Sequence, residues 1–192
     1  MPDIDKTEVH FNLVNAKIKL EDIDSFVLPN GNSFNISSIV GPIRQTDLFM
    51  QIDGMLNDFT ANVTASTNSG FIKAEIESKG NMPNPHYSGK VVVDKFDLNP
   101  IFGKTAPVGD LTAVVTFSGQ GLSSNNYFID GDAKILSLVY NKYNYSDINV
   151  KGNVKPGVFE GHLLVDDRNI SMDFDGMINF SEKLPVFDFI AK

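Results

Sequence analysis

The 192-residue chain contains no cysteine and no tryptophan. Without cysteine there are no disulfides, thiol nucleophiles or thiolate metal ligands, and without tryptophan there is no indole platform for a sugar ring. No apolar run approaches the roughly 18 residues of a membrane-spanning helix. Helical periodicity is nearly absent as well, because the one plausible helical turn is Leu98–Gly103 and Pro100 keeps it short. These absences point to a β-rich chain without an obvious chemical centre.

Positive charge is also scarce. The chain has 16 lysine and arginine residues against 24 aspartate and glutamate residues, a net charge of −8. Nucleic acids and anionic lipid headgroups both attract basic surfaces, so the composition argues against either as a partner. Hydrophobic residues make up 42% of the chain, enough for a substantial core. We therefore expect residues 1–192 to form a single β-rich domain, or a fragment of a longer repeat array.

Catalytic and metal-binding patterns are missing among the polar residues. His10, His86 and His162 lie far apart in sequence and lack a metal-ligand spacing. Asp130–Asp132 and Asp166–Asp167 do not continue into a calcium-binding loop and are typical of turns. Phosphate-binding loops and Ser/His/Asp arrangements do not stand out either. We predict a protein that is not an enzyme and that has no metal or other cofactor.

The most prominent pattern is a long alternation of apolar and polar residues from Ile148 to Phe180. A period of two places successive side chains on opposite faces of a β-strand. The stretch therefore predicts antiparallel strands with one apolar face and one polar face. Val158, Leu164 and Met177 are the apolar residues that fall on the polar side.

Most of the remaining chain shows the same alternation. Residues 97–109 hold two prolines and two glycines and interrupt it, which divides the chain into two meanders at roughly 7–96 and 110–192. In the first strand the apolar positions change phase between Leu13 and Val14. A slip of one residue in a long strand predicts a β-bulge.

Glycine recurs at one place in the alternation. The pattern apolar-polar-apolar-polar-glycine occurs at Met50–Gly54, Ile148–Gly152 and Met172–Gly176, with a partial copy at Phe128–Gly131. Glycine inside a strand often marks a bulge or a bend. Repeated bends are expected to curve the sheet in one sense.

Two arrangements fit a sheet with one apolar face. Two sheets can pack face to face so that the apolar side is filled, and the residues alone favour this closed sandwich. Alternatively, one open and curved sheet leaves its apolar concave face free for acyl chains or for a strand of another protein, because large exposed apolar patches are usually functional. The alternation fits both arrangements.

Several segments of the chain resemble the AsmA-like family, and within it the TamB-like proteins of Bacteroidota-type bacteria. The resemblance covers residues 90–192 well and 34–89 loosely. It is carried by the segments Phe96–Phe102, Gly109–Ala113, Phe117–Gly121, Tyr143–Gly152, Phe159–Asp167, Asn169–Gly176 and Ser181–Phe187. It implies an all-β fold with almost no helix: a long, curved antiparallel meander, shaped like a taco, with an open groove and an apolar concave face.

The resemblance also implies a function. Such proteins are anchored in the inner membrane, span the periplasm, move phospholipid toward the outer membrane and support outer-membrane protein assembly. This chain would be an internal piece without the anchor, its partners phospholipid acyl chains or another amphiphile, and an outer-membrane β-barrel protein. The groove would be lined by the apolar positions of the matched strands, namely Leu111, Ala113, Val115, Phe117, Ile148, Val150, Val154, Phe159, Leu163, Val165, Ile170, Met172, Phe174, Ile178 and Phe180.

The alternative function is a structural or interaction module that binds no lipid, built as a closed sandwich or as a scaffold that pairs strands with a partner. In either case an exposed strand at the edge of the sheet would be adhesive. We therefore also expect that two copies of the chain can pair through their edges.

Overall fold

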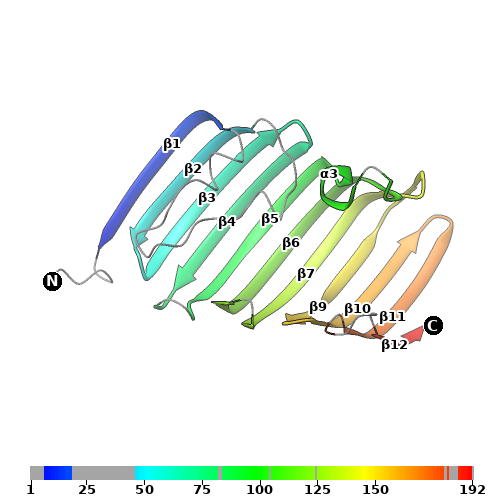
Figure 1. Cartoon of the computed structure of the whole chain (residues 1–192). Helices are drawn as coiled ribbons and strands as arrows, with labels where there is room; N and C mark the ends of the chain where they lie inside the picture. The colour runs from blue at the N-terminus through cyan, green and yellow to red at the C-terminus, as the bar shows by residue number, and fades with distance from the viewer. Residues whose placement is uncertain are drawn as a thin grey trace.

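The computed structural model describes residues 7–18, 46–81, 84–103, 105–123, 125–179, 181 and 186–191. These residues form one antiparallel sheet of twelve strands and a single helical turn. Figure 1 shows the strands side by side in one curved layer. The elements are β1 (Glu8–Ile18), β2 (Thr46–Met55), β3 (Asp58–Thr67), β4 (Gly70–Lys79), β5 (His86–Asp97), α3 (Asn99–Phe102), β6 (Val108–Ser123), β7 (Asn126–Tyr140), β8 (Tyr143–Tyr145), β9 (Ile148–Lys155), β10 (Val158–Asp167), β11 (Ile170–Asn179) and β12 (Val186–Ala191).

The sheet is a meander that does not close on itself. Each strand pairs with the next one along the chain from β1 to β7, and again from β9 to β12. β8 and β9 both pair with β7, as one strand interrupted at Ser146 and Asp147, where Asp147 has a φ of 50°. β1 and β12 form the two edges, and the described part of the chain contains no second sheet. Of the two arrangements open to the sequence, the single open sheet is therefore the one observed.

The break at residues 97–109 does not interrupt the sheet. It contains α3, which confirms the predicted helical turn, and Pro100 occupies the start of that turn. On either side of the break, β5 and β6 pair from His86 opposite Gln120 to Asp97 opposite Asp110. The two sequence meanders thus join into one continuous layer.

Short turns keep the meander in register. Two-residue connections join several of the hairpins, for example Tyr140 and Tyr143, which are opposite each other across Asn141 and Lys142. These two central residues have φ values of 50° and 67°. Left-handed conformations at both central positions are typical of the type I′ turn, whose twist matches that of the strands.

Bulges in β1 and β5 change which side chains face each way, and the pairing of β6 with β7 is also irregular at three points. The pairing of β1 with β2 shifts between Leu13 and Ala16, with Asn15 at a φ of 55°, which confirms the bulge predicted from the change of phase. A second shift lies between Val93 and Phe96 of β5, where Lys95 has a φ of 47°. Each bulge returns the following apolar residue to the same face of the sheet.

The best-buried apolar side chains lie on one face and come from strands along most of the sheet. No large side chain in the described residues is fully buried, because nothing described packs over this face along its length. The buried apolar residues are Leu48, Ala61, Phe96, Ala113, Ile148 and Val165.

Candidate functional site

The two faces of the sheet differ sharply in burial. In β4 the apolar residues Ile72, Ala74 and Ile76 are half-buried, whereas the interleaved Lys73 and Glu75 are exposed. The same alternation of half-buried and exposed positions runs through β7 from Tyr127 to Ile135. One layer of strands can half-bury a single face by curving toward it, since side chains crowd together only on the inside of a curve.

The register aligns the apolar residues into rows that cross the strands. Val115 lies opposite Ala133, Ala133 opposite Val150, and Val150 opposite Leu163. Leu163 in turn lies opposite Phe174 of β11. A neighbouring row contains Ala113, Ile135, Ile148, Val165 and Met172.

The predicted lining residues all lie on this face, apart from Phe180, which is outside the described residues. The two rows above account for eight of the predicted positions. Val154, Phe159 and Ile178 form part of a third row. This row crosses β9 and β11 near their C-terminal ends and β10 near its N-terminal end. Phe117 belongs to a fourth row, described below. Leu111 and Ile170 lie near the N-terminal ends of β6 and β11.

The fourth row is bare of side chains in one half of the sheet. Gly131, Gly152, Gly161 and Gly176 lie opposite one another across four adjacent strands. Three of these glycines belong to the repeat seen in the sequence, and Gly161 does not. Gly54, the remaining glycine of the repeat, lies outside the row and pairs with Val9 and Phe59.

Close approach of the backbone requires glycine at two positions of this row, Gly152 and Gly161. A β-carbon on Gly152 would lie 2.8 Å from the Cα of Gly161, and one on Gly161 would lie 2.7 Å from the Cα of Gly152. The Phe159 ring lies over both positions, 3.0 Å and 2.9 Å from the two added β-carbons. The Phe117 ring covers Gly89 in the same manner, since a β-carbon added to Gly89 would lie 2.9 Å from the ring.

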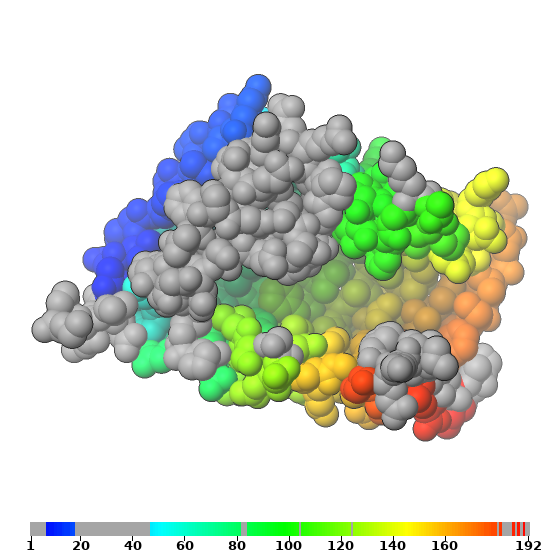
Figure 2. Space-filling view, viewed as in Figure 1, coloured from blue at the N-terminus to red at the C-terminus, as the bar shows by residue number. Residues whose placement is uncertain are grey.

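Together the four rows line a groove that runs across the strands. Figure 2 shows the hollow that the curved sheet encloses on one side. No residue of the four rows is charged, and the strands that contribute to them extend from β1 to β12. Within the described residues the site is therefore a largely apolar trough with no charged residue in its four rows.

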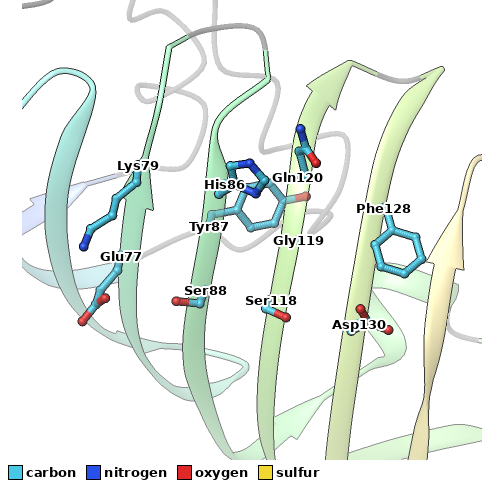
Figure 3. A pocket seen from close by; sticks show the side chains of 10 residues that line it. All are labelled: Glu77, Lys79, His86, Tyr87, Ser88, Ser118, Gly119, Gln120, Phe128 and Asp130. Atoms are coloured by element: carbon cyan, nitrogen blue, oxygen red, sulfur yellow. The ribbon is translucent and has the colours of Figure 1, made fainter.

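In the described residues the outer face carries open depressions lined by polar and aromatic residues. The one in Figure 3 has a volume of about 360 Å³. Ser88 and Ser118 point into it from neighbouring strands, between Glu77 on β4 and Asp130 on β7. These groups are exposed and come from the polar side of the alternation, and no arrangement of nucleophile and base occurs among them.

Two histidines of the outer face, His10 and His162, lie beside exposed carboxylates. His10 Nδ1 is 3.1 Å from Asp53 Oδ1, and its Nε2 is 3.1 Å from Glu8 Oε1. Hydrogen bonds that the imidazole ring donates to the carboxylates of Asp53 and Glu8 raise the pKa of His10. His162 Nδ1 lies 3.5 Å from Asp173 Oδ1. Among the described residues, no group of three or more His, Asp or Glu could hold a metal ion.

Asp167 is a buried carboxylate that the sequence placed in a turn. It ends β10 with 8% of its surface exposed. Its carboxylate accepts hydrogen bonds from the Tyr143 hydroxyl at 2.6 Å and from the backbone amide of Asn169 at 3.0 Å. The amide and hydroxyl of Ser146 donate two more, at 2.9 and 3.1 Å. These donors lower the pKa of Asp167 to about 2, and the carboxylate raises the pKa of Tyr143. Asp167 thus fastens the interruption between β8 and β9 to the β10–β11 turn.

No helix in the described residues has the length and apolar character needed to cross a membrane. Comparisons of the chain with protein-family models, with curated proteins and with solved structures return no match.

Proposed function

We propose that this chain is a non-enzymatic segment of a lipid-carrying β-groove, as its resemblance to AsmA-like, TamB-like proteins implies. The observation that supports the proposal is the set of uncharged apolar rows that cross the strands on the inside of an open sheet. A closed core would not leave such rows open along their length.

The physics of the groove suits an acyl chain. Each methylene removed from water contributes about 0.8 kcal/mol, so a smooth apolar wall can hold a lipid tail without a polar contact. Because the rows carry no charge, a tail could slide along them and meet similar surroundings at each strand. The exposed polar outer face keeps such a trough in solution while the inside stays apolar.

The wider setting follows from the resemblance. We place the segment in the periplasm, within a longer protein anchored in the inner membrane by a part outside this chain. Its task there is to carry phospholipid toward the outer membrane and to support outer-membrane protein assembly. An amphiphile with one or two acyl chains is the cargo that the groove accommodates best.

The experiment replaces two lining residues with aspartate. Val150 and Phe174 flank Leu163 in one row, so the double variant Val150→Asp/Phe174→Asp puts two charges at successive positions along the trough. The matched control is Asn149→Asp/Ser171→Asp, which adds the same groups to the same two strands on the outer face. Native mass spectrometry after gentle purification, and binding of a fluorescent fatty acid, provide the two readouts.

We expect bound lipid and probe binding with the wild type and the control, and loss of both with the groove variant. Circular dichroism establishes that each variant is folded. A wild-type chain that carries no lipid and binds no fatty acid would contradict the proposal, as would equal binding by the two double variants.

The second candidate function is a scaffold whose groove or edges hold a strand of a protein partner. The open edges of the sheet favour it, because an edge strand presents unpaired backbone groups. Capture of a purified outer-membrane β-barrel protein by a chain that binds no fatty acid would support the scaffold over the lipid groove.

A further inference from the structure

The β1 edge of the sheet carries apolar side chains that nothing in the described residues covers. β1 pairs only with β2 and lies at one margin of the layer (Figure 1). Phe11 faces the groove side opposite Ile52, yet 44% of its surface is exposed. Exposed edge strands with apolar side chains pair readily with another strand.

We propose that β1 pairs with β1 of a second copy of this chain, antiparallel, around a two-fold axis perpendicular to the sheet. Such an axis keeps the apolar faces of both copies on one side. Residues opposite each other must then share a face. The register that meets this condition over Val9–Leu13, ahead of the bulge, places Phe11 opposite Phe11 of the second copy.

This register matches side chains by type on both faces. On the groove side Val9 lies opposite Leu13 of the second copy, and the two Phe11 rings meet at the centre. On the outer side His10 lies opposite Asn12, so no like charges are opposed. Aromatic and polar pairs of this kind stabilise antiparallel strands.

The other edge offers no equivalent register. β12 has six residues, Val186–Ala191. Two registers pair five of these residues and keep opposed residues on the same face. One places Asp188 opposite Asp188 of the second copy, and the other places it opposite Ile190. Like charges repel across a strand pair, and Asp188 opposite Ile190 gains no polar contact, although this sheet already pairs Asp175 with Ile190. The charge pattern therefore favours β1.

The pairing would also continue the groove. The row that contains Phe11, Ile52 and Ala61 would run through the axis into the same row of the second copy. The apolar face would then extend across both sheets without a step. The inference stands on the edge alone and does not depend on the lipid proposal, since it can be tested without lipid.

The first test is the mass of the full chain by light scattering over a range of concentrations. We compare the wild type with Phe11→Lys and with a matched control, Phe49→Lys. Phe49 is 45% exposed and lies on the adjacent strand, but on the outer face. We expect a reversible dimer for the wild type and the control, and a dissociation constant about tenfold or more higher for Phe11→Lys.

The second test uses the absence of cysteine from the chain. Opposed Cα atoms in an antiparallel pair are about 4.5–5.5 Å apart, within the range of a disulfide. Phe11→Cys should therefore give a disulfide-linked dimer on mild oxidation, and Phe49→Cys should not. A wild type that stays monomeric, equal loss of the dimer in both lysine variants, or cross-linking through His10→Cys or Asp188→Cys in place of Phe11→Cys would overturn the proposal.

Discussion

The two halves of the groove share an apolar pattern but differ along one row. From β1 to β4 this row is filled by the side chains of Phe11, Ile52, Ala61 and Ile76. From β7 to β11 the same row consists of four glycines, so that the backbone itself forms the surface. The change occurs across β5 and β6, where the Phe117 ring covers Gly89.

The difference shows two ways of making a concave apolar surface. In the first half, side chains fill the inside of the curve. In the second half, Gly152 and Gly161 bring two strands so close that no β-carbon fits between them, and the Phe159 ring covers the gap. Glycine is unfavourable in strand interiors unless a bend or a close approach requires it. The contact between Gly152 and Gly161 therefore indicates that close approach of the backbone shapes this half at β9 and β10.

The largest effect is expected from filling the bare row. In Gly161→Ala the new β-carbon would contact the Lys151 carbonyl and lie 2.7 Å from the Gly152 Cα. Backbone atoms cannot move aside cheaply, so we expect a loss of about 2–4 kcal/mol in the free energy of unfolding. The midpoint and slope of urea denaturation measure it.

Gly131→Ala is the matched control within the same row. Its added β-carbon would lie 3.9 Å from the Thr116 carbonyl oxygen and 4.0 Å from that of Gly152, an ordinary contact. Stability should stay unchanged or rise by up to about 1 kcal/mol, because alanine restricts the unfolded chain. Equal losses in the two variants would show that the row does not depend on the close approach at Gly152 and Gly161.

The next largest effect concerns the second half, in the hydrogen bonds that Asp167 accepts from Tyr143, Ser146 and Asn169. The folded pKa of about 2 lies below the ordinary value of 3.8. A lowered pKa means that the ionised carboxylate stabilises the fold above about pH 4, and that this contribution is lost as the pH falls toward 2. Asp167→Asn should lack the contribution at neutral pH, so its urea midpoint should lie below that of the wild type and converge with it near pH 2.

Asp166→Asn provides the control for this titration, because Asp166 is the exposed neighbour of Asp167. Its urea midpoint should follow the wild type across the whole range. A difference between wild type and Asp167→Asn that stays constant from pH 7 to pH 2 would contradict the assigned role of the ionised carboxylate.

A smaller effect is expected in the filled half, where removal of atoms should matter more than addition. Ile76 is half-buried between Ala61 and Gly89 on the neighbouring strands. Ile76→Ala should lower the free energy of unfolding by about 1–2 kcal/mol, less than for a fully buried isoleucine. Glu75→Ala, on the outer face of the same strand, should change it by about 0.5 kcal/mol or less. If the two variants prove alike, the first half does not use its row for packing.

The smallest effect concerns the bulges of the first half. Lys95 and Asn15 both have left-handed backbones, with φ values of 47° and 55°. Such a backbone is unfavourable for most residues, and asparagine tolerates it better than lysine. Lys95→Gly should therefore raise the free energy of unfolding by about 0.5 kcal/mol, and Asn15→Gly by less. A loss of stability in Lys95→Gly would indicate that the lysine side chain has a separate role.

The sequence predicts the strands and their faces because a period of two is a local property. The alternation from Ile148 onward and the slip at Leu13 both required only neighbouring residues. Leu98–Gly103 was likewise identified by its proline and by the loss of the alternation. These features do not depend on which strand lies next to which.

The rows could not be predicted in the same way, because they depend on the register between strands. Gly161 was missed since it follows a single apolar-polar step and so lies outside the repeat. The bulge at Lys95 has a signal in the sequence, the change of phase between Val93 and Phe96, but a change of phase alone does not show which strand lies alongside. The buried position of Asp167 depends on Tyr143 and Ser146, which reach it only after β8 and β9 have folded beside β10.

Because the rows run across the strands, the length and the cross-section of the trough depend on different features of the sheet. Strand length and the bend of each strand set the cross-section of the trough, whereas the number of strands sets its length. Adjacent strands are about 4.8 Å apart, so one additional hairpin lengthens the trough by about 10 Å and leaves its width unchanged. Duplication of a hairpin would therefore lengthen the trough without altering its cross-section.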